Sequence, residues 1–426
     1  MVAMNGKMKK LLILGGFAQI TDVIQDAVDA GYYVIVTDNI PDSPGKTIAH
    51  ESHATSITDI DGLIRLCRER QVDGVMNYCI HSGQKAYQKV CEALDMPCYG
   101  TSEQFDILTE KNKFKNVCVA NNLDVVDSYP PVFEDLMRLP KSDFPIVIKP
   151  ADGRASKGVS VCNAHSELEE AIQNASRNST NGCFIAEKFM NAPEVAVKYF
   201  VVDGEISLTS MSDIYTLYQE GLRVYIWTQT FPSRHYELFL READAKVREF
   251  IRRLGVSNGP LSFSGFVDGE RFRFIDPSFR MGGAQDWLLV DEITGVNISK
   301  LMTQFAVSGS MGDPSTIASI DGRFSQKASS MLYFLVGLGT IGKIVGVDEA
   351  RKVQAVIGCH QTHREGDVVK DFGTSEHVLF RFLLVAENVQ ELIAAILEVQ
   401  SYIAVFDDQG RNMLLQNFDA ALLVRS

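Results

Sequence analysis

The first hundred residues alternate between short, continuous apolar runs and segments with helical spacing, and this alternation constrains the fold more than any other feature. The apolar runs are KKLLILG (9–15), YYVIVTD (32–38) and VDGVMNY (72–78). The helical segments are ITDVIQDAVDA (20–30), IDGLIRLCRER (60–70) and GQKAYQKVCEAL (83–94). Elements that alternate in this way form a parallel sheet covered by helices. We therefore expect a Rossmann-like α/β domain over residues 1–105.

A dinucleotide site is the first function to weigh for such a domain. Asp38 ends the second apolar run, at the place where a ribose-binding acid would lie. However, Gly15 to Ala18 lack the G-x-G-x-x-G spacing that lets the backbone approach a pyrophosphate. The glycines are better explained as the turn from strand to helix at the edge of a substrate cleft. An NAD-dependent dehydrogenase is therefore disfavoured.

Composition argues against several other classes of protein. The formal net charge of −13 repels phosphate backbones, so nucleic acid is not an expected partner. No apolar run approaches the ~20 residues of a membrane span, and the run after MVAMNGKMKK is too short for a signal peptide. The eight cysteines show no CxxC spacing, which argues against a zinc site and a disulfide framework. We expect a cytoplasmic globular protein with no membrane partner.

The pattern changes at FPIVIKP (144–150) to short strands, glycine turns and fewer helices, as in an α+β domain. The tetrapeptide VDGE occurs twice, at 202–205 and 267–270, and each copy predicts a hairpin turn between apolar runs. The segment SELEEAIQNAS (166–176) predicts a helix with Ser166 as its N-cap. A third, glycine-punctuated region begins near residue 316. We expect domains over 106–315 and 316–426 that pack closely on the first.

The segment VIKPADGRASKGVS (147–160) is the most informative local feature. Lys149 ends an apolar strand, and the loop DGRASKG (152–158) after it combines small residues with basic side chains and backbone N–H groups. Such a loop can fold over the phosphates of a nucleotide. The same letters also describe many plain hairpins.

A second feature is FIAEKFMNAPE (184–194), which places Glu187 at the end of an apolar strand and Glu194 seven residues later. These acids, with a free backbone from Lys188 to Met190, would supply an adenine edge and then a ribose contact. An ordinary surface strand is the alternative.

The third feature is the hairpin SFSGFVDGERFRFIDPSFRMGG (262–283). Asp276 and Ser278 share one face of its second arm, and Ser264 lies about opposite on the first arm. Magnesium prefers oxygen ligands, typically one or two carboxylates together with nucleotide phosphates. The alternative is that Asp276 caps the strand and Arg280 pairs with an acid.

In this order and at these separations, the three features resemble the ATP-grasp superfamily of carboxylate–amine ligases, over nearly the whole chain. The resemblance implies an ATP-grasp fold, α/β and α+β, with an N-terminal Rossmann-like pre-ATP-grasp domain and a C-terminal α+β domain. The C-terminal region, with GTIGKIVG (339–346), is similar to that of L-amino-acid ligases. EKNKFK (110–115) resembles the family's DK motif, with Glu110 in place of the usual Asp and Lys111 as the first nucleotide lysine.

The resemblance also implies roles for individual residues. The expected ATP-binding residues are Lys111, Lys149, Ser156, Lys157, Gly158, Glu187, Lys188, Met190, Glu194 and Ile275. The expected magnesium ligands are Asp276, Ser278 and Ser264, and the expected substrate contacts are Arg280, Gly282, Gly283 and His81. Arg280 and Asp276 would be catalytic. In the family the three metal positions are Glu, Glu and Asn, so only one carboxylate remains here.

Two hypotheses follow from this resemblance. In the first, a substrate carboxylate attacks the γ-phosphate of ATP and the resulting acyl phosphate reacts with an amine, giving an amide, ADP and phosphate. The partners would be a small-molecule carboxylate and amine, with amino acids or peptides as the expected substrates, and relatives suggest a homodimer. In the second, the metal site has decayed, and the protein binds nucleotide without turnover as a regulatory or partner subunit.

Other candidate residues carry less weight. His360 and His363 invite a zinc interpretation, but residues three apart on a strand face opposite sides. Tyr215, Trp227 and Arg234 precede the helical segment at 241–255, where some could line an acceptor pocket. Core packing explains the two aromatic residues equally well.

Overall fold

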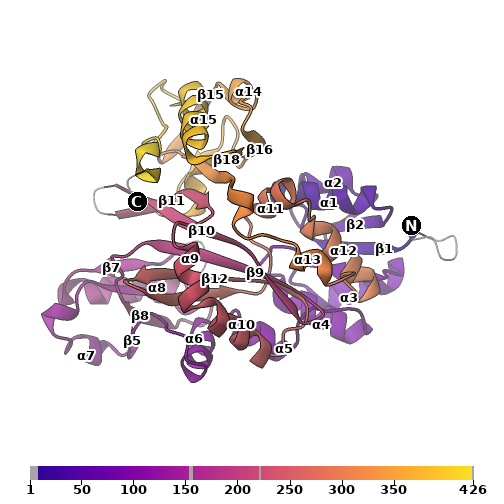
Figure 1. Cartoon of the computed structure of the whole chain (residues 1–426), viewed down its shortest axis with the longest axis horizontal. Helices are drawn as coiled ribbons and strands as arrows, with labels where there is room; N and C mark the ends of the chain where they lie inside the picture. Colours follow the sequence, from indigo (N-terminus) through magenta and orange to yellow (C-terminus); the bar gives the residue numbers. More distant parts are fainter. Residues whose placement is uncertain (1–7, 153–156, 220–221, 425–426) are drawn as a thin grey trace.

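The computed structural model describes residues 8–152, 157–219 and 222–424, and its N-terminal part contains the predicted parallel sheet (Figure 1). The strand order is β3-β2-β1-β4, with all neighbours parallel. The strands are β1 (Lys10–Leu14), β2 (Tyr33–Thr37), β3 (Glu51–His53) and β4 (Gly74–Met76). The accompanying helices are α1 (Thr21–Asp29), α2 (Gly45–Ile48), α3 (Ile60–Arg70) and α4 (Gln84–Leu94). The predicted alternation of strand and helix is therefore confirmed.

Asp38 has a local role at the end of β2. Its carboxylate accepts hydrogen bonds from the N–H of Gly16 at 2.9 Å, the hydroxyl of Ser43 at 2.8 Å and the N–H of Ile40 at 2.9 Å. These bonds fix the turn that Gly15, with φ +88°, begins. The acid that would have bound a ribose is thus engaged in holding the strand-to-helix turn.

A small lobe follows, built on an antiparallel sheet of order β5-β8-β6-β7. Its elements are β5 (Ser128–Tyr129), α7 (Phe133–Leu136), β6 (Ile146–Pro150), β7 (Ser160–Cys162), α8 (Leu168–Arg177) and β8 (Phe184–Lys188). The lobe has a separate hydrophobic core, in which one face of α8 packs on β6. The prediction of Ser166 as N-cap was wrong, because residues 165–167 form a short 3₁₀ turn and α8 begins only at Leu168.

The centre of the molecule is an eight-stranded antiparallel sheet of order β13-β12-β9-β10-β11-β14-β18-β16 (Figure 1). Its strands are β9 (Glu194–Val202), β10 (Glu205–Gln219), β11 (Leu222–Phe231), β12 (Gly259–Asp268), β13 (Arg271–Ser278), β14 (Ala328–Leu335), β16 (Val356–Gln361) and β18 (Val378–Ala386). Both VDGE copies form the predicted turns, and Gly204 and Gly269 have φ values of +84° and +62°. The sheet continues across the predicted boundary between residues 315 and 316.

The remaining elements cover these sheets and complete the C-terminal region. The helices are α5 (Ser102–Ile107), α6 (Lys111–Ala120), α9 (Tyr236–Glu242), α10 (Asp244–Arg253), α11 (Trp287–Thr294), α12 (Ile298–Ser308), α13 (Ser315–Ala318), α14 (Val347–Ala350) and α15 (Val389–Tyr402). A small sheet of order β17-β15-β19 joins β15 (Gly339–Val345), β17 (Val368–Val369) and β19 (Ala404–Asp407). Although distant in sequence, α12 packs on the N-terminal sheet, where it contacts β1 and β4. This contact ties the central region to the N-terminal one.

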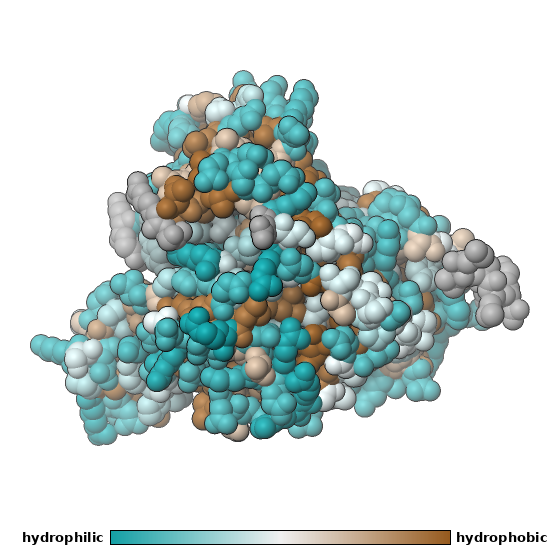
Figure 2. Space-filling model, viewed as in Figure 1, coloured by the Kyte–Doolittle hydropathy of each residue, from teal (hydrophilic) through white to brown (hydrophobic). Residues whose placement is uncertain are grey.

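Hydrophilic residues dominate the outer surface in Figure 2, and hydrophobic residues gather along the middle of the same view. None of the eight cysteines forms a disulfide. Within the described part of the chain, no helix combines the length and the apolar character needed to cross a bilayer.

Candidate active site

Two lysines hold one buried glutamate where the small lobe meets α6. Glu187, near the end of β8, forms ion pairs with Lys149 Nζ, 2.7 Å from Oε2, and with Lys115 Nζ, 2.5 Å from Oε1. Lys149 lies on the neighbouring strand β6, and Lys115 lies on α6. Lys115 also donates to the carbonyl of Val126 and the hydroxyl of Ser128. The three charged side chains form a closed, buried group.

Burial and neighbouring charges shift the pKa values of the two lysines in opposite directions. Burial lowers the pKa of Lys149, but Asp276 and Glu187 outweigh it and leave the pKa above its ordinary value. Burial also lowers the pKa of Lys115, and here Glu187 does not fully compensate, so the pKa stays below its ordinary value. Lys149 is therefore the more firmly charged of the two.

Asp276 on β13 is the carboxylate that faces these cations. Lys111 Nζ, at the start of α6, lies 3.3 Å from its Oδ1. Burial alone would raise the pKa of Asp276, but Lys149 and Lys111 outweigh it and hold the pKa below its ordinary value. The carboxylate is thus ionised at neutral pH, as a magnesium ligand must be.

The register of the hairpin places Ser264 of β12 directly opposite Asp276, and Ser262 opposite Ser278. A bulge at Ile275 keeps this pairing while β13 bends. The Ser278 hydroxyl is buried and has no hydrogen-bond partner among the described residues. Nowhere in that part of the chain do three His, Cys, Asp or Glu side chains cluster as metal ligands would. One carboxylate with an unpartnered hydroxyl suits a single Mg²⁺ held largely by phosphates and water, and a metal bound by protein ligands alone does not fit.

The other predicted nucleotide residues lie around this group. Glu194 begins β9, and burial raises its pKa although Arg223 of β11, 3.7 Å away, opposes the shift. Gly158 has φ +74°, and a Cβ there would lie 2.8 Å from the Pro150 ring and 2.7 Å from the Asn178 Cβ. Lys157 is exposed and reaches Asp371 of the C-terminal region at 3.5 Å. Ser156 lies outside the described residues.

The predicted free backbone after Glu187 was wrong for the N–H groups of Lys188 and Phe189. The N–H of Lys188 donates to the carbonyl of Asp127 at 3.0 Å, and the N–H of Phe189 donates to that of Pro145 at 3.3 Å. These bonds arise because neighbouring chain segments continue to pair with the end of β8. Met190 follows directly, in irregular chain before β9.

The segment that carries Arg280 is held by the N-terminal region. The carbonyl of Phe279 accepts from the Gln84 amide at 2.8 Å and the Tyr99 hydroxyl at 3.0 Å. The N–H of Met281 donates to the carbonyl of Tyr78 at 3.1 Å. His81 lies in the loop between β4 and α4 that supplies Tyr78, and Gln84 is the first residue of α4. The segment with Arg280 is thereby hydrogen-bonded to the loop that contains His81, 199 positions earlier in the sequence.

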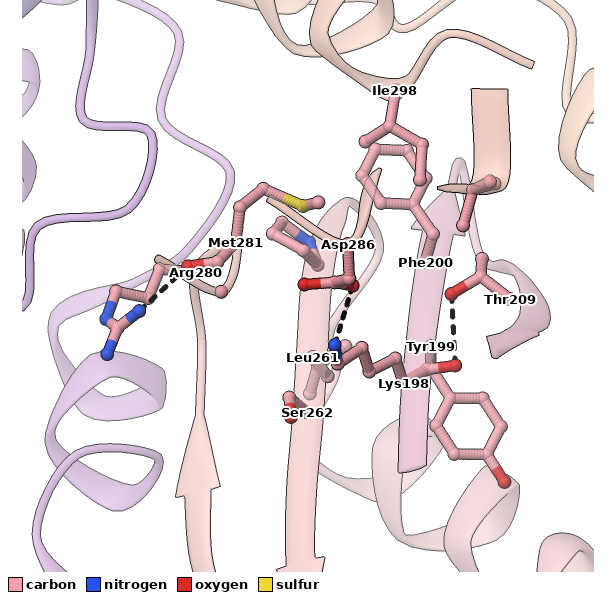
Figure 3. Close-up of a pocket in the computed structure, with 13 residues that line it drawn as sticks. Lys198, Tyr199, Phe200, Thr209, Leu261, Ser262, Arg280, Met281, Asp286 and Ile298 are labelled. Carbon is pink, nitrogen blue, oxygen red and sulfur yellow. Dashed lines mark hydrogen bonds and ion pairs between the residues drawn. The ribbon is translucent and has the colours of Figure 1, made fainter. Parts of the chain in front are cut away.

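A small pocket lies behind this segment (Figure 3). Lys198 Nζ of β9 and Asp286 Oδ2 form a buried ion pair of 2.6 Å at its centre. Asp286 Oδ1 has no hydrogen-bond partner among the described residues. A Cβ on Gly282 would lie 3.0 Å from that oxygen, so glycine lets the loop approach the aspartate closely. Arg280 points away from the ion pair toward the N-terminal region, and its Nη1 donates to the Met281 carbonyl at 2.8 Å.

Several weaker candidates lie elsewhere. Trp227 and Tyr215 pack edge-on against Phe418 near the C-terminus, which supports the packing interpretation of both. Arg234 lies 3.8 Å from Asp213 in an ion pair. His360 lies on β16, whereas His363 follows the strand.

Sequence reasoning missed Lys115, Lys198, Asp286, Arg223 and the loop contact of Gln84. Only Lys115 left a signal, since it lies four residues after Lys111 and therefore on the same face of a helix. The others are brought to the site by strand pairing and by contacts between regions, which no local pattern encodes.

Comparisons with known proteins agree with this geometry. Residues 142–275 match the family model described as an ATP-grasp domain. Among curated proteins, an Aspergillus fumigatus protein named ATP-grasp enzyme fsqD is 23% identical over 39% of this chain and 29% of its own length. A D-alanine--D-alanine ligase of Fusobacterium nucleatum is 24% identical over 44% of this chain and 62% of its own length. The matches thus span less than two thirds of these two relatives.

Other matches extend further along the chain. A formate-dependent phosphoribosylglycinamide formyltransferase of Francisella tularensis is 25% identical over 82% of this chain and 87% of its own length. Among solved structures, an L-amino acid ligase from Bacillus licheniformis superposes with a TM-score of 0.80 at 21% identity, covering 95% of this chain and all of the other. An N5-carboxyaminoimidazole ribonucleotide synthetase from Thermotoga maritima gives 0.69 at 18% identity, over 94% of this chain and all of the other. The likeness of fold therefore covers all three regions of the chain.

Proposed function

Since the chain is a member of the ATP-grasp superfamily, we propose that it is an ATP-dependent carboxylate–amine ligase. ATP phosphorylates a substrate carboxylate, and an amine then displaces phosphate from the acyl phosphate to form an amide. The first two products are ADP and the acyl phosphate, and the last two are the amide and phosphate.

One observation carries the proposal, namely the convergence of Lys111 and Lys149 on Asp276. The three residues come from α6, β6 and β13, and both lysines act on the aspartate. Buried lysine side chains around one ionised carboxylate suit a polyphosphate with its metal ion. The lysines neutralise phosphate oxygens, and the carboxylate binds the metal ion. A site of this kind needs no covalent nucleophile from the protein.

Each side chain then has a defined task in the reaction. Lys111 and Lys149 bind phosphate oxygens of ATP, and Glu194 binds the ribose hydroxyls. Asp276, with Ser278 and Ser264, would hold Mg²⁺, which when bound neutralises negative charge on the transferring phosphoryl group. Arg280 binds the substrate carboxylate and then the acyl phosphate, and the backbone at Gly282 and Gly283 orients it.

We further propose that the substrates are amino acids or short peptides. The similarity of fold to an L-amino acid ligase over the whole of that chain supports this choice. A homodimer and a cytoplasmic location remain predictions from the sequence.

The test is release of ADP and phosphate from ATP and magnesium with pools of L-amino acids and of other small carboxylates. Lys149→Ala serves as the blank, because it removes a cation from the nucleotide site. Release that depends on one amino-acid pool is the expected result. Release only with a different carboxylate would contradict the substrate class, and no release with any pool would contradict the ligase.

A second function is favoured by the hydroxyls at positions 264 and 278. With one carboxylate at the metal strand, the protein could bind ATP without turning it over. This alternative requires ATP affinity that is nearly independent of magnesium, together with no ADP formation. Titration calorimetry with ATP, with and without magnesium, separates the two functions.

A further inference from the structure

A buried arginine from the C-terminal region reaches the substrate loop. Arg381 lies on β18 and is 7% exposed. Its Nη1 donates to the carbonyl of Gly283 at 3.1 Å, only three residues from Arg280. In the sheet it pairs with Tyr333 of β14 on one side and His360 of β16 on the other. The C-terminal region thus places the guanidinium of Arg381 beside the loop that carries Arg280.

Arg381 has no carboxylate partner in the described part of the chain. No Asp or Glu of those residues lies within 4 Å of its guanidinium, and its Nε has no hydrogen-bond partner there. Tyr333 also supports it, since the guanidinium carbon lies 5.3 Å from the centre of the tyrosine ring. A buried cation without a counter-charge is costly, so this position suits an anion that arrives with a ligand.

The two side chains that pair with Arg381 across the sheet are polar and uncharged. Burial raises the pKa of Tyr333 to about 12, although Arg381 opposes the shift. Burial, assisted by Arg381, lowers the pKa of His360 to about 4, so this imidazole is neutral at neutral pH. His360 Nε2 is buried and has no hydrogen-bond partner among the described residues. These three side chains therefore offer one fixed positive charge and an unused neutral ring nitrogen.

Both arginines affect the pKa of one residue of the N-terminal region, Cys79. Burial raises the pKa of the Cys79 thiol to about 12, while Arg280 and then Arg381 act in the opposite direction. Cys79 follows β4 in the loop that holds the Arg280 segment. Arg280 follows β13 and Arg381 lies on β18 of the same central sheet, and the hydrogen bond of Arg381 to Gly283 brings it to the segment that carries Arg280.

We propose that Arg381 binds the carboxylate of the amine substrate, with His360 as a neutral hydrogen-bond partner, so that this substrate is an amino acid or a peptide. The inference rests on the ligase function proposed above, in which Arg280 binds the acyl phosphate. The amine nitrogen forms a bond to the acyl carbon, the bond from that carbon to the phosphate oxygen breaks, and a proton leaves to solvent. Arg381 takes no part in bond formation and sets which amines are accepted.

The experiment compares acceptors with and without the carboxylate. With the best donor from the pool assay, kcat/KM is measured for L-alanine and for L-alaninamide, which keeps the amine and lacks the negative charge. In the same assay hydroxylamine, a small amine without a carboxylate, traps the acyl phosphate as a hydroxamate. The wild-type protein should favour alanine. Arg381→Met should lower the ratio of kcat/KM for alanine over alaninamide by about 10- to 100-fold, mainly through KM, as loss of a charge-assisted contact predicts.

Two further variants make the result decisive. Arg381→Lys keeps the positive charge and should lower the ratio less, and it carries the test if the methionine variant does not fold. Arg411→Met removes an arginine whose side chain is 70% exposed and which pairs with Asp407, and it should leave the ratio unchanged. An unchanged ratio in both Arg381 variants, or a wild-type preference for the amide, would overturn the inference. Failure of the wild type to form hydroxamate with any carboxylate would overturn the ligase proposal itself, and this inference with it.

Discussion

Glu187 is the residue on which the electrostatics of the nucleotide site depend. It is shared by two lysines from different elements, so its carboxylate fixes where both ammonium groups lie before any ligand binds. Of the two, Lys149 also interacts electrostatically with Asp276, which keeps its pKa raised and its side chain charged. The pKa of Lys115 is lowered, mainly by burial. This asymmetry suggests that Lys149 is the phosphate ligand and that Lys115 positions Glu187.

The positioning role of Lys115 can be measured as stability. Lys115→Met should lower the free energy of unfolding by about 2–4 kcal/mol, because one side of a buried ion pair is removed while the glutamate remains. In a double-mutant cycle with Glu187→Gln, measured by urea unfolding, the double variant should lose less stability than the sum of the two single losses, by about 1 kcal/mol or more. Lys113→Met is the matched control, since Lys113 lies on the same helix with 46% of its side chain exposed and should cost less than about 1 kcal/mol. Equal losses in the two lysine variants would contradict the assignment.

Asp276 should make stability depend on pH in acid. Its folded pKa lies below the ordinary 3.8, so the unfolded chain takes up the proton first and the stabilisation is lost as pH falls through that range. Asp276→Asn should therefore be less stable than the wild type at pH 6, and the difference should shrink by pH 3.5. Urea unfolding at both pH values measures it. Asp348→Asn, at a side chain that is 82% exposed, should show no such trend. A stability difference between the wild type and Asp276→Asn that grows as the pH falls would contradict a lowered pKa for Asp276.

Among the elements, the hairpin of β12 and β13 shows what a sequence can predict and what it cannot. The VDGE turn and the period-2 alternation were sufficient to place Ser264 opposite Asp276, because hairpin register follows from local turn chemistry. The same logic gave the strands and helices of the N-terminal sheet. It failed for Ser166, where a 3₁₀ turn delays the helix, and for the backbone at Lys188, whose N–H donates to the carbonyl of Asp127, 61 residues earlier. Partners brought by tertiary contacts leave no local signal.

The register of this hairpin predicts a gain of function. Ser264→Glu would place a second carboxylate across from Asp276, and a second negative oxygen ligand should raise magnesium affinity in the presence of ATP. Calorimetry of magnesium into the protein–ATP complex should show binding at least several-fold tighter than in the wild type. Ser264→Gln matches the size without the charge and should not do so. If the glutamate variant binds magnesium no better, position 264 does not face the metal.

On the scale of the whole molecule, the site exists only because three regions meet. The N-terminal loop holds Phe279 and Met281, the small lobe supplies Lys149 and Glu187, and the C-terminal strands supply Arg381. The division at residue 315 was drawn from composition, yet β14, β18 and β16 continue the central sheet beyond that point. We therefore regard the C-terminal region as part of the folding unit of the sheet rather than as an appended domain.

This view predicts the outcome of a truncation. A chain that ends at residue 315 would leave β11 paired with β10 alone and would expose its other edge at Thr228–Phe231, because the partners on that side, Ser329–Leu332, lie on β14, which is buried along its whole length. An exposed edge next to an uncovered apolar face favours aggregation, so the fragment should be insoluble or lack a cooperative thermal transition. Sedimentation and near-ultraviolet circular dichroism measure both properties, and residues 316–426 supplied in trans during refolding should restore solubility. A monomeric fragment 1–315 that unfolds cooperatively would show instead that the two regions fold independently, and that β14 docks on a sheet already complete without it.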